Sequence, residues 1–229
     1  MTGQMRRLMF VLRRRAGLTD AEFRRHWRDA HGQLVAHHAA TLGIGRYQQV
    51  HTRRDLPSFG DRIDGIAEIC FDKVSPSGSD ADRAVAASAL LEDERRFIDL
   101  TLSPLWIARE ETLQDGVRTG TRINIAMRFD GESLHGIPER LIDAHRGDGS
   151  MTLLRTPSNS HTELAAARQS PPPYDAFVEV WSGRPGRADP RQLQAEVAAL
   201  ATSMSEGTTD LAIWCSTVHP IVGGEPRIT

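Results

Sequence analysis

The stretch that decides the fold lies near the N-terminus and reads FRRHWRDAH at residues 23–31, followed by RYQQVHT at 46–52 and DGIAE at 64–68. Thr19 and Glu22 precede it in the pattern of a capping box, whose two side chains satisfy free amides at a helix start. We therefore predict a helix from about residue 19 to residue 42, where Gly43 ends it. The two segments that follow are typical of strands.

The rest of the chain extends this pattern and then repeats it. In the first half we predict strands at 5–14, 46–52, 64–71 and 102–109, a second helix at 80–91, and a last helical turn at 92–99. In the second half we predict strands at 122–129, 150–155, 176–181 and 211–219, helices at 138–145 and 189–203, and a loop at 158–174. Each half is thus a βαββαβ unit, the ferredoxin-like arrangement.

Two such units in one chain define the expected fold class: α+β, with tandem ferredoxin-like βαββαβ repeats forming a dimeric-type α/β barrel. We place one repeat at 1–115 and a degenerate second repeat at 121–229, with a linker near 114–121. Helices cover only one face of each sheet, so the bare faces must be buried against something. That burial can occur within the chain or across a homodimer, and we predict the homodimer.

Composition excludes several classes of protein. The 229 residues carry a formal net charge of -2 and only short basic runs, so nothing suggests a nucleic-acid partner. No apolar run approaches the ~20 residues that a membrane helix needs, and we see no secretory signal, so we expect no membrane partner and a cytoplasmic protein. Cys70 and Cys215 lack metal-ligand spacing and are interpreted as buried thiols.

The quoted helix, the strand ending near His51, the DGIAE strand and the segment EDERRFID at 92–99 together resemble the EthD family of the dimeric α/β-barrel superfamily. The resemblance covers roughly residues 5–111, whereas the second half shares only the order of strands. It implies the barrel fold and, more loosely, a reaction. Members of the superfamily include polyketide cyclases, muconolactone isomerase, cofactor-free monooxygenases and haem-degrading enzymes.

The first helix carries one apolar face on which histidines stand. The spacing places Trp27, His31 and His38 toward the sheet, and the neighbouring arginines, Arg24, Arg25 and Arg28, toward water. A partly desolvated imidazole can give or take a proton near neutral pH. The alternative is a core histidine that hydrogen-bonds to the backbone or to a carboxylate. His31 and His38 lie too far apart along a helix to share one zinc ion, so we predict no metal.

On the second strand Tyr47, Gln49 and His51 share one face, and Glu68 on the next strand can lie close to them. Glu68 would then orient a histidine base, while Tyr47 or Gln49 would donate to a developing enolate oxygen. A Glu68 side chain facing solvent is the alternative, since register is open and a slip of one residue reverses the faces. Trp106 is predicted to form part of the pocket wall.

These residues predict a cofactor-free lyase or isomerase, of the dehydratase or cyclase type, that acts on a small apolar carbonyl compound of aromatic or polyketide-like character. The expected catalytic residues are His31, His51 and Glu68, and the expected substrate-binding residues are Trp27, His38, Tyr47, Gln49 and Trp106. Two alternatives stay open, a non-catalytic protein that binds a small hydrophobic ligand and a cofactor-free monooxygenase.

Overall fold

The computed structural model describes residues 6–61, 63–71, 75–129, 136–145, 149–155, 174–183 and 189–223. The predicted loop at 158–174 lies outside these residues except for its last position. Within the described residues the predicted order of strands and helices is confirmed in both halves. The alternation of apolar and polar residues therefore placed every strand of the two repeats.

The first half consists of four strands and two helical runs. Its strands are β1 (Arg6–Leu12), β2 (Arg46–Thr52), β4 (Gly65–Cys70) and β5 (Leu105–Gln114). One continuous helical run connects β1 to β2 and comprises α1 (Asp20–Arg25), η1 (His26–His31) and α2 (Gly32–Leu42). The helix α3 (Asp80–Phe97) connects β4 to β5, and a short strand β3 (Ser58–Phe59), which we did not predict, pairs with the last strand of the chain.

The second half contains β6 (Arg122–Phe129), α4 (Ile137–Ala144), β7 (Met151–Arg155), β8 (Ala176–Trp181), α6 (Pro190–Met204) and β9 (Thr208–Val222). The capping residues behave as their types predict. Thr19 and Glu22 form the capping box of α1, Gly43 ends α2 with φ 69°, and Asp189 caps α6. α3 continues through the segment for which we predicted only a last turn, and β9 is longer than expected at both ends.

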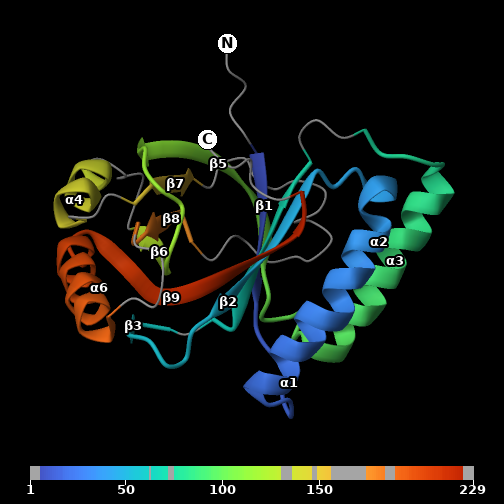
Figure 1. Ribbon diagram of the computed structural model, residues 1–229, viewed down its shortest axis with the longest axis horizontal. Coiled ribbons are helices and arrows are strands. Elements are labelled where there is room, and N and C mark those ends of the chain that lie inside the picture. The colour runs from blue at the N-terminus through green and yellow to red at the C-terminus, as the bar shows by residue number, and fades with distance from the viewer. Residues whose placement is uncertain are drawn as a thin grey trace.

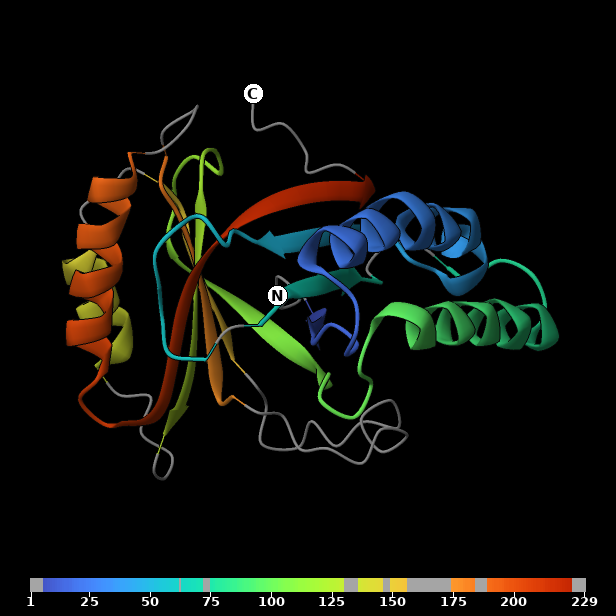
Figure 2. The ribbon, with the colours of Figure 1, turned by 90° about the horizontal axis from the view of Figure 1, so that it is seen from below.

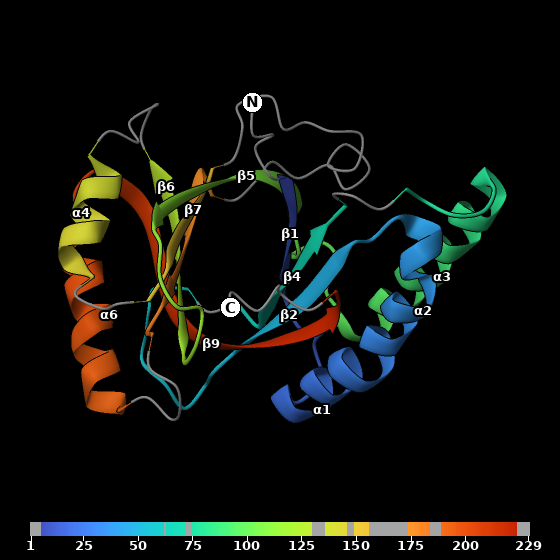
Figure 3. The same cartoon turned by 45° about the horizontal axis from the view of Figure 1, so that its top comes forward.

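Eight strands close into an antiparallel barrel within the single chain. The ring runs β2-β4-β1-β5-β7-β8-β6-β9 and returns to β2 through the β2–β9 pairing. Figure 3 shows these strands between two helical layers, α1 to α3 on one side and α4 with α6 on the other. The tandem repeats thus bury their bare sheet faces on each other, which is the first of the two arrangements that the sequence allowed.

Alternation along the strands separates an outer apolar layer from the barrel interior. Side chains such as Phe10, Phe23 and Phe97 pack between the sheet and helices of the first half, and Ile125, Leu141 and Leu200 do so in the second. Inside the barrel, Met9, Val50, Trp106, Phe177 and Trp214 belong to a third buried cluster. These interior side chains are therefore buried and form one contiguous apolar cluster.

Next to that interior cluster, two buried arginines pair with buried glutamates of the opposite repeat. Arg7 of β1 pairs with Glu179 of β8, and Arg122 of β6 pairs with Glu68 of β4. Arg7 also lies 3.1 Å from Glu68, and Arg122 lies 2.9 Å from Glu179, so both carboxylates share both guanidinium groups. We call these four residues the interior ion-pair network. Burial opposes the ionisation of Glu68, but Arg122 and Arg7 outweigh it and hold the pKa of Glu68 below its usual value.

The network follows an internal two-fold relation between the repeats. Met9 pairs in register with Glu68 and Trp106, as Asn124 pairs with Glu179 and Trp214. Arg7 and Arg122 each stand two residues before these positions. Because Glu68 and Glu179 occupy equivalent positions in this register, each half contains a strand with the pattern apolar-Glu-apolar.

Removal of one buried arginine should destabilise the barrel strongly. Arg122→Met leaves two buried carboxylates with one guanidinium group, and we expect a loss of about 3–5 kcal/mol in the free energy of unfolding. Arg155→Met is the matched control, because Arg155 pairs with Glu111 at a position where both side chains are more than a third exposed. That pair should contribute about 1 kcal/mol or less. Equal losses in urea titrations of the two variants would contradict this account.

Candidate functional site

A π-helical segment in the first helical run sets the geometry of the site. Within η1 the backbone bonds run from residue i+5 to residue i, as the amide of Gly32 to the carbonyl of Trp27 shows. The extra residue in this turn shifts the buried face of the helix. Phe23, Trp27 and His31 are buried as predicted, but Val35 and Ala39 follow them in place of Leu34 and His38.

The shift corrects the prediction for His38. Its side chain is only half-buried, and its ring contacts the neighbouring His37 rather than the sheet. A regular helix was assumed for the sequence pattern, and one inserted residue was enough to rotate His38 away. Segments of π-helix are frequent at functional sites, so the residues packed beneath η1 are candidates for a functional site.

The Trp27 ring lies flat on the sheet because the residue beneath it, Gly65, has no side chain. A Cβ atom at Gly65 would come within 2.4 Å of the Trp27 ring, so only glycine fits beneath the indole. The His51 ring, paired in register with Gly65, stacks on Trp27 with a centroid separation of 4.3 Å. The close packing of Trp27 thus explains why the DGIAE motif contains a glycine, and the Trp27 ring fixes the plane of the His51 imidazole.

Hydrogen bonds then fix the protonation of His51. Gln49 donates through Nε2 to the carbonyl of Trp27 at 2.7 Å and to the Tyr47 hydroxyl at 3.2 Å. Since a carbonyl only accepts, the amide orientation of Gln49 is set, and its Oε1 faces His51 Nε2 at 3.0 Å. The proton of neutral His51 therefore resides on Nε2. Nδ1 carries the free lone pair and makes no hydrogen bond to the described residues.

A cleft of about 370 Å³ opens beside this histidine. It is lined by Ala21, Arg24, Arg25, Arg28, His51, Thr217 and His219. The first four come from α1 and η1, His51 comes from β2, and the last two come from β9 of the second repeat. Figure 2 shows β9 extending alongside β2 toward the first helical run, which is how the second repeat reaches this site.

The cleft is cationic, contrary to the expected apolar pocket. Three arginines and two histidines line it, and no carboxylate does among the described residues. The rings of His51 and His219 meet edge to face at 4.8 Å. Burial, together with His219, Arg24 and Arg28, lowers the pKa of His51 to about 3. Burial and the same arginines also lower the pKa of His219.

His31 belongs to a different cluster, on the side of the helix that faces α3. Its Nδ1 lies 3.0 Å from Asp93 Oδ2, and His26 Nε2 lies 3.0 Å from Asp93 Oδ1. The two histidines are five residues apart, and the π-turn brings both to one carboxylate. We call His26, His31 and Asp93 the His–Asp–His clasp. The hydrogen bond from His31, followed by the charges of the two histidines, holds the pKa of Asp93 below its usual value despite burial.

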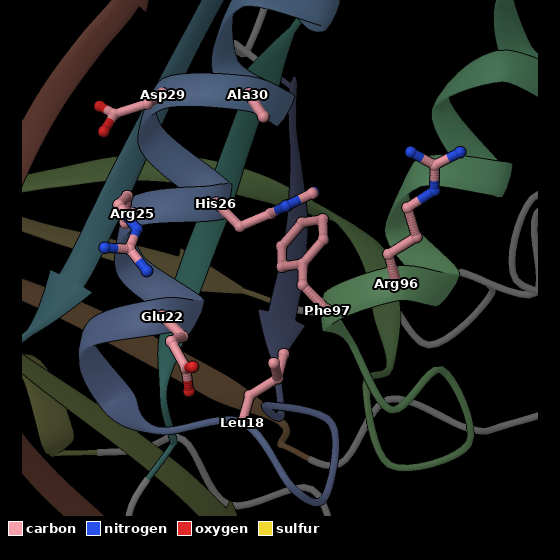
Figure 4. Close-up of a pocket in the computed structure, with 8 residues that line it drawn as sticks. All are labelled: Leu18, Glu22, Arg25, His26, Asp29, Ala30, Arg96 and Phe97. Carbon is pink, nitrogen blue, oxygen red and sulfur yellow. The ribbon is translucent and has the colours of Figure 1, made fainter.

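A second hollow, of about 430 Å³, lies beside the clasp. Figure 4 shows the side chains of His26 and Phe97 next to each other in its lining, with Arg96 on α3 and with Arg25 and Asp29 directed away from them. Asp93 lies in the segment at 92–99 and was not among the predicted site residues. Asp93 is buried because α3 extends far enough to place it against η1.

The predicted pairing of Glu68 with His51 is wrong. Gln48, not Gln49, stands opposite Glu68 in register, so Glu68 faces the barrel interior and His51 faces the helix. Trp106 likewise lies inside the barrel, away from the cleft. Tyr47 and Gln49 are buried behind His51 and support it rather than lining the cleft. The three predicted catalytic residues therefore occupy three separate environments.

The sequence analysis missed the arginines and the second-repeat histidine that line the cleft. Arg24 and Arg28 were expected to point to water. Arg28 is exposed as expected and Arg24 is only partly exposed, but both also line the cleft. His219 stands opposite Gln49 in the β2–β9 pairing. Only barrel closure brings these strands together, so spacing within either repeat could not have found His219.

Several expected absences concern the described residues only. In these residues no group of three or more histidine, cysteine, aspartate or glutamate side chains could hold a metal ion. No described helix is long and apolar enough to cross a membrane. Cys70 and Cys215 are free and buried, as predicted, and burial raises the pKa of the Cys215 thiol to about 12.

Comparison with known proteins identifies the segment that builds this site. Residues 15–101 match the family model described as the EthD domain. This segment is thus similar to the EthD domain. It includes the π-turn, Trp27, His51 and Asp93, but the match ends before the second repeat begins. A search of curated proteins finds no match.

Solved structures support the barrel fold of the whole chain. Two mutant forms of chlorite dismutase from Candidatus Nitrospira defluvii align over nearly all of it. One, in complex with cyanide, is 13% identical, covers 96% of this chain and 93% of its own, and has a TM-score of 0.50. The other is 11% identical with coverages of 94% and 93% and the same TM-score. At such identities the likeness shows the fold alone.

The depressed pKa of His51 should make folding stability depend on pH. The unfolded chain takes a proton on this histidine below about pH 6.5, whereas the folded protein takes it only near pH 3. Stability contributed by neutral His51 is thus complete above about pH 6.5 and is lost as the pH falls toward 3. The slope should be at most ~1.4 kcal/mol per pH unit.

Urea unfolding of the wild type and His51→Gln at about pH 7 and about pH 5 measures this dependence. The wild type should lose roughly 2 kcal/mol more than the variant between the two conditions, because the variant lacks the titrating group. Carboxylates titrate equally in both proteins and cancel in the comparison. Parallel pH profiles would show that His51 is not held neutral in the folded state.

Proposed function

We propose that the EthD-domain cleft carries out cofactor-free acid–base catalysis on a small enolisable carbonyl compound, as a lyase or isomerase. The observation that carries the proposal is the free lone pair on Nδ1 of His51, in a ring whose plane and protonation are fixed by Trp27 and Gln49. A base held in one tautomer at a cationic cleft suits proton removal beside a carbonyl group.

In the proposed reaction Nδ1 of His51 takes a proton from the carbon next to the carbonyl. The electron pair of the broken C–H bond forms a C=C bond, and the carbonyl electrons move to oxygen to give an enolate. Arg24 and Arg28 stabilise this oxyanion electrostatically. Return of the proton to another carbon completes an isomerisation. Loss of a β-hydroxyl group as water, protonated by the imidazolium, completes a dehydration.

The His–Asp–His clasp contains a second candidate for the base. Asp93 holds His31 Nδ1, as a carboxylate that orients a catalytic imidazole would do. His31 does not line the cationic cleft, so we assign it the smaller role of fixing η1 against α3. On this proposal His31 positions the helix that carries Arg24 and Arg28, and His51 performs the proton transfer.

A binding protein without catalysis is the second candidate function, and the same pKa favours it. A histidine with a pKa of about 3 is a weak base in the unliganded cleft. The two functions differ in one respect: a catalyst needs His51 for turnover, whereas a binding protein needs it at most for affinity. The cofactor-free monooxygenase stays an alternative outcome, recognised by oxygen consumption.

His51→Gln tests the proposal directly. Glutamine keeps the hydrogen bond to Gln49 but has no basic nitrogen, so turnover of an enolisable aromatic ketone or β-hydroxy ketone should fall by about 10²–10⁴-fold. His38→Gln is the matched control, because His38 is a half-buried histidine outside the cleft. Circular dichroism verifies the fold of both variants. Full turnover by His51→Gln would exclude His51 as the base, and His31→Gln would then be assayed in its place.

We also propose that two copies of the chain associate, as the sequence analysis predicted. Barrel closure covers the bare sheet faces within one chain, so a homodimer would use the outer surface of the molecule. Light scattering decides the matter, with an expected mass of about twice 25.4 kDa. A mass equal to one chain would show that internal closure has removed the need for a partner.

A further inference from the structure

We propose that the substrate of the cleft carries a carboxylate, and that this anion binds to Arg28 and Arg24 and activates His51 and His219 by charge neutralisation. The inference rests on the proposed function, because it names the class of substrate for the same site. Its basis is that Arg24 and Arg28 lie in the same cleft as His51 and His219, whose imidazole rings are kept neutral.

The first step concerns the hydrogen-bonding capacity of the two arginines. Arg28 uses Nε for Asp29 at 2.8 Å, which leaves both of its Nη atoms without a partner among the described residues. Arg24 donates through Nη2 to the carbonyl of Thr52, and its Nε forms an ion pair with Asp20 without a hydrogen bond, which leaves Nη1 with no hydrogen-bond partner among the described residues. The paired Nη atoms of a guanidinium group match the two oxygens of a carboxylate.

The second step concerns the charge balance of the cleft. Arg24, Arg25, Arg28, His51 and His219 line it. Asp20 and Asp29 pair with Arg24 and Arg28 from outside the lining and offset part of their charge, so the positive charge in excess of these two pairs is that of Arg25. A partly enclosed site with cationic walls concentrates anions. Its volume of about 370 Å³ lies at the small end of the range for ligand sites, which suits a compound of one or two rings.

The third step links anion binding to the histidines. Burial is the largest cause of their lowered pKa values, and the positive charges of Arg24 and Arg28 add to it. A carboxylate between the arginines opposes that positive field, so protonation of both imidazoles becomes easier. The substrate would thereby strengthen the base that acts on it, and neutral analogues would leave His51 weakly basic.

Benzoate and benzamide, which share a ring and differ in charge, are the probes. We expect isothermal titration calorimetry at low ionic strength to show benzoate binding to the wild type at least about 10-fold more tightly than benzamide. Arg28→Gln should remove about 10-fold of the benzoate affinity, the equivalent of one charge-assisted hydrogen bond. Arg83→Gln is the matched control, since Arg83 forms an exposed pair with Asp80 on α3.

Nitrogen NMR of the imidazoles supplies the second readout. With benzoate bound, the signals of His51 and His219 should titrate at a higher pH than in the free protein, and benzamide should cause no shift. Equal binding of the two probes, or equal loss in Arg28→Gln and Arg83→Gln, would overturn the inference. If benzoate binds as expected while His51→Gln keeps full turnover, the anion site stands and the proposed catalytic role of His51 fails.

Discussion

The rest of the structure depends on the interior ion-pair network that joins the two repeats. Arg7 and Arg122 are fully buried, and each reaches across the barrel to a glutamate of the other repeat. A buried charge is tolerated only when it is paired and hydrogen-bonded, so a slip of either sheet would leave uncompensated charges in the core. The network therefore specifies which faces meet and in which register, while the surrounding apolar side chains supply most of the stabilisation.

Ion pairs and aromatic rings lie in the barrel interior, whereas the cationic cleft lies on the outer face of the sheet. Adjacent residues of β2 face opposite sides of the sheet. Gln48 contacts Glu68 in the barrel interior, and Gln49 contacts Trp27 and His51 on the outer side. Figure 1 shows β2 on the side of the barrel that faces the helices of the first repeat, with β9 passing beside it. The same strand pairing that closes the barrel thus brings Thr217 and His219 to the cleft.

The sequence predicted what repeats and local patterns can encode. Alternation and capping residues located the strands and helices of both repeats, and strand periodicity correctly placed Tyr47, Gln49 and His51 on one face of β2. The contact of that face with Trp27 was not predicted, because strand periodicity does not say which face of the sheet the helices cover. The pairing of Glu68 could not be decided, since adjacent residues on β2 face opposite sides and register depends on the whole barrel. His38 was misplaced because one extra residue in η1 rotates the following helix, and no composition rule signals that insertion. His219 lay in the other repeat, where local spacing carries no information about β2.

Comparison of the two repeats explains why only one of them holds a cleft. Under the internal two-fold relation, Arg155 of β7 corresponds to His51 and Ala176 of β8 corresponds to Gly65. Arg155 pairs in register with Ala176, just as His51 pairs with Gly65. Even the added methyl group of an alanine would collide with an indole stacked as Trp27 is on Gly65. The second repeat therefore cannot hold a tryptophan and a histidine in this way, and Arg155 instead pairs with Glu111 near the surface. The two equivalent sheets of one chain thus differ in what they contribute to the cleft. The first repeat supplies the helical run and His51, and the second supplies the strand β9, which completes the lining. The constraint that allows this division is reciprocal pairing inside the barrel, since it keeps the two sheets in register after their outer faces have diverged.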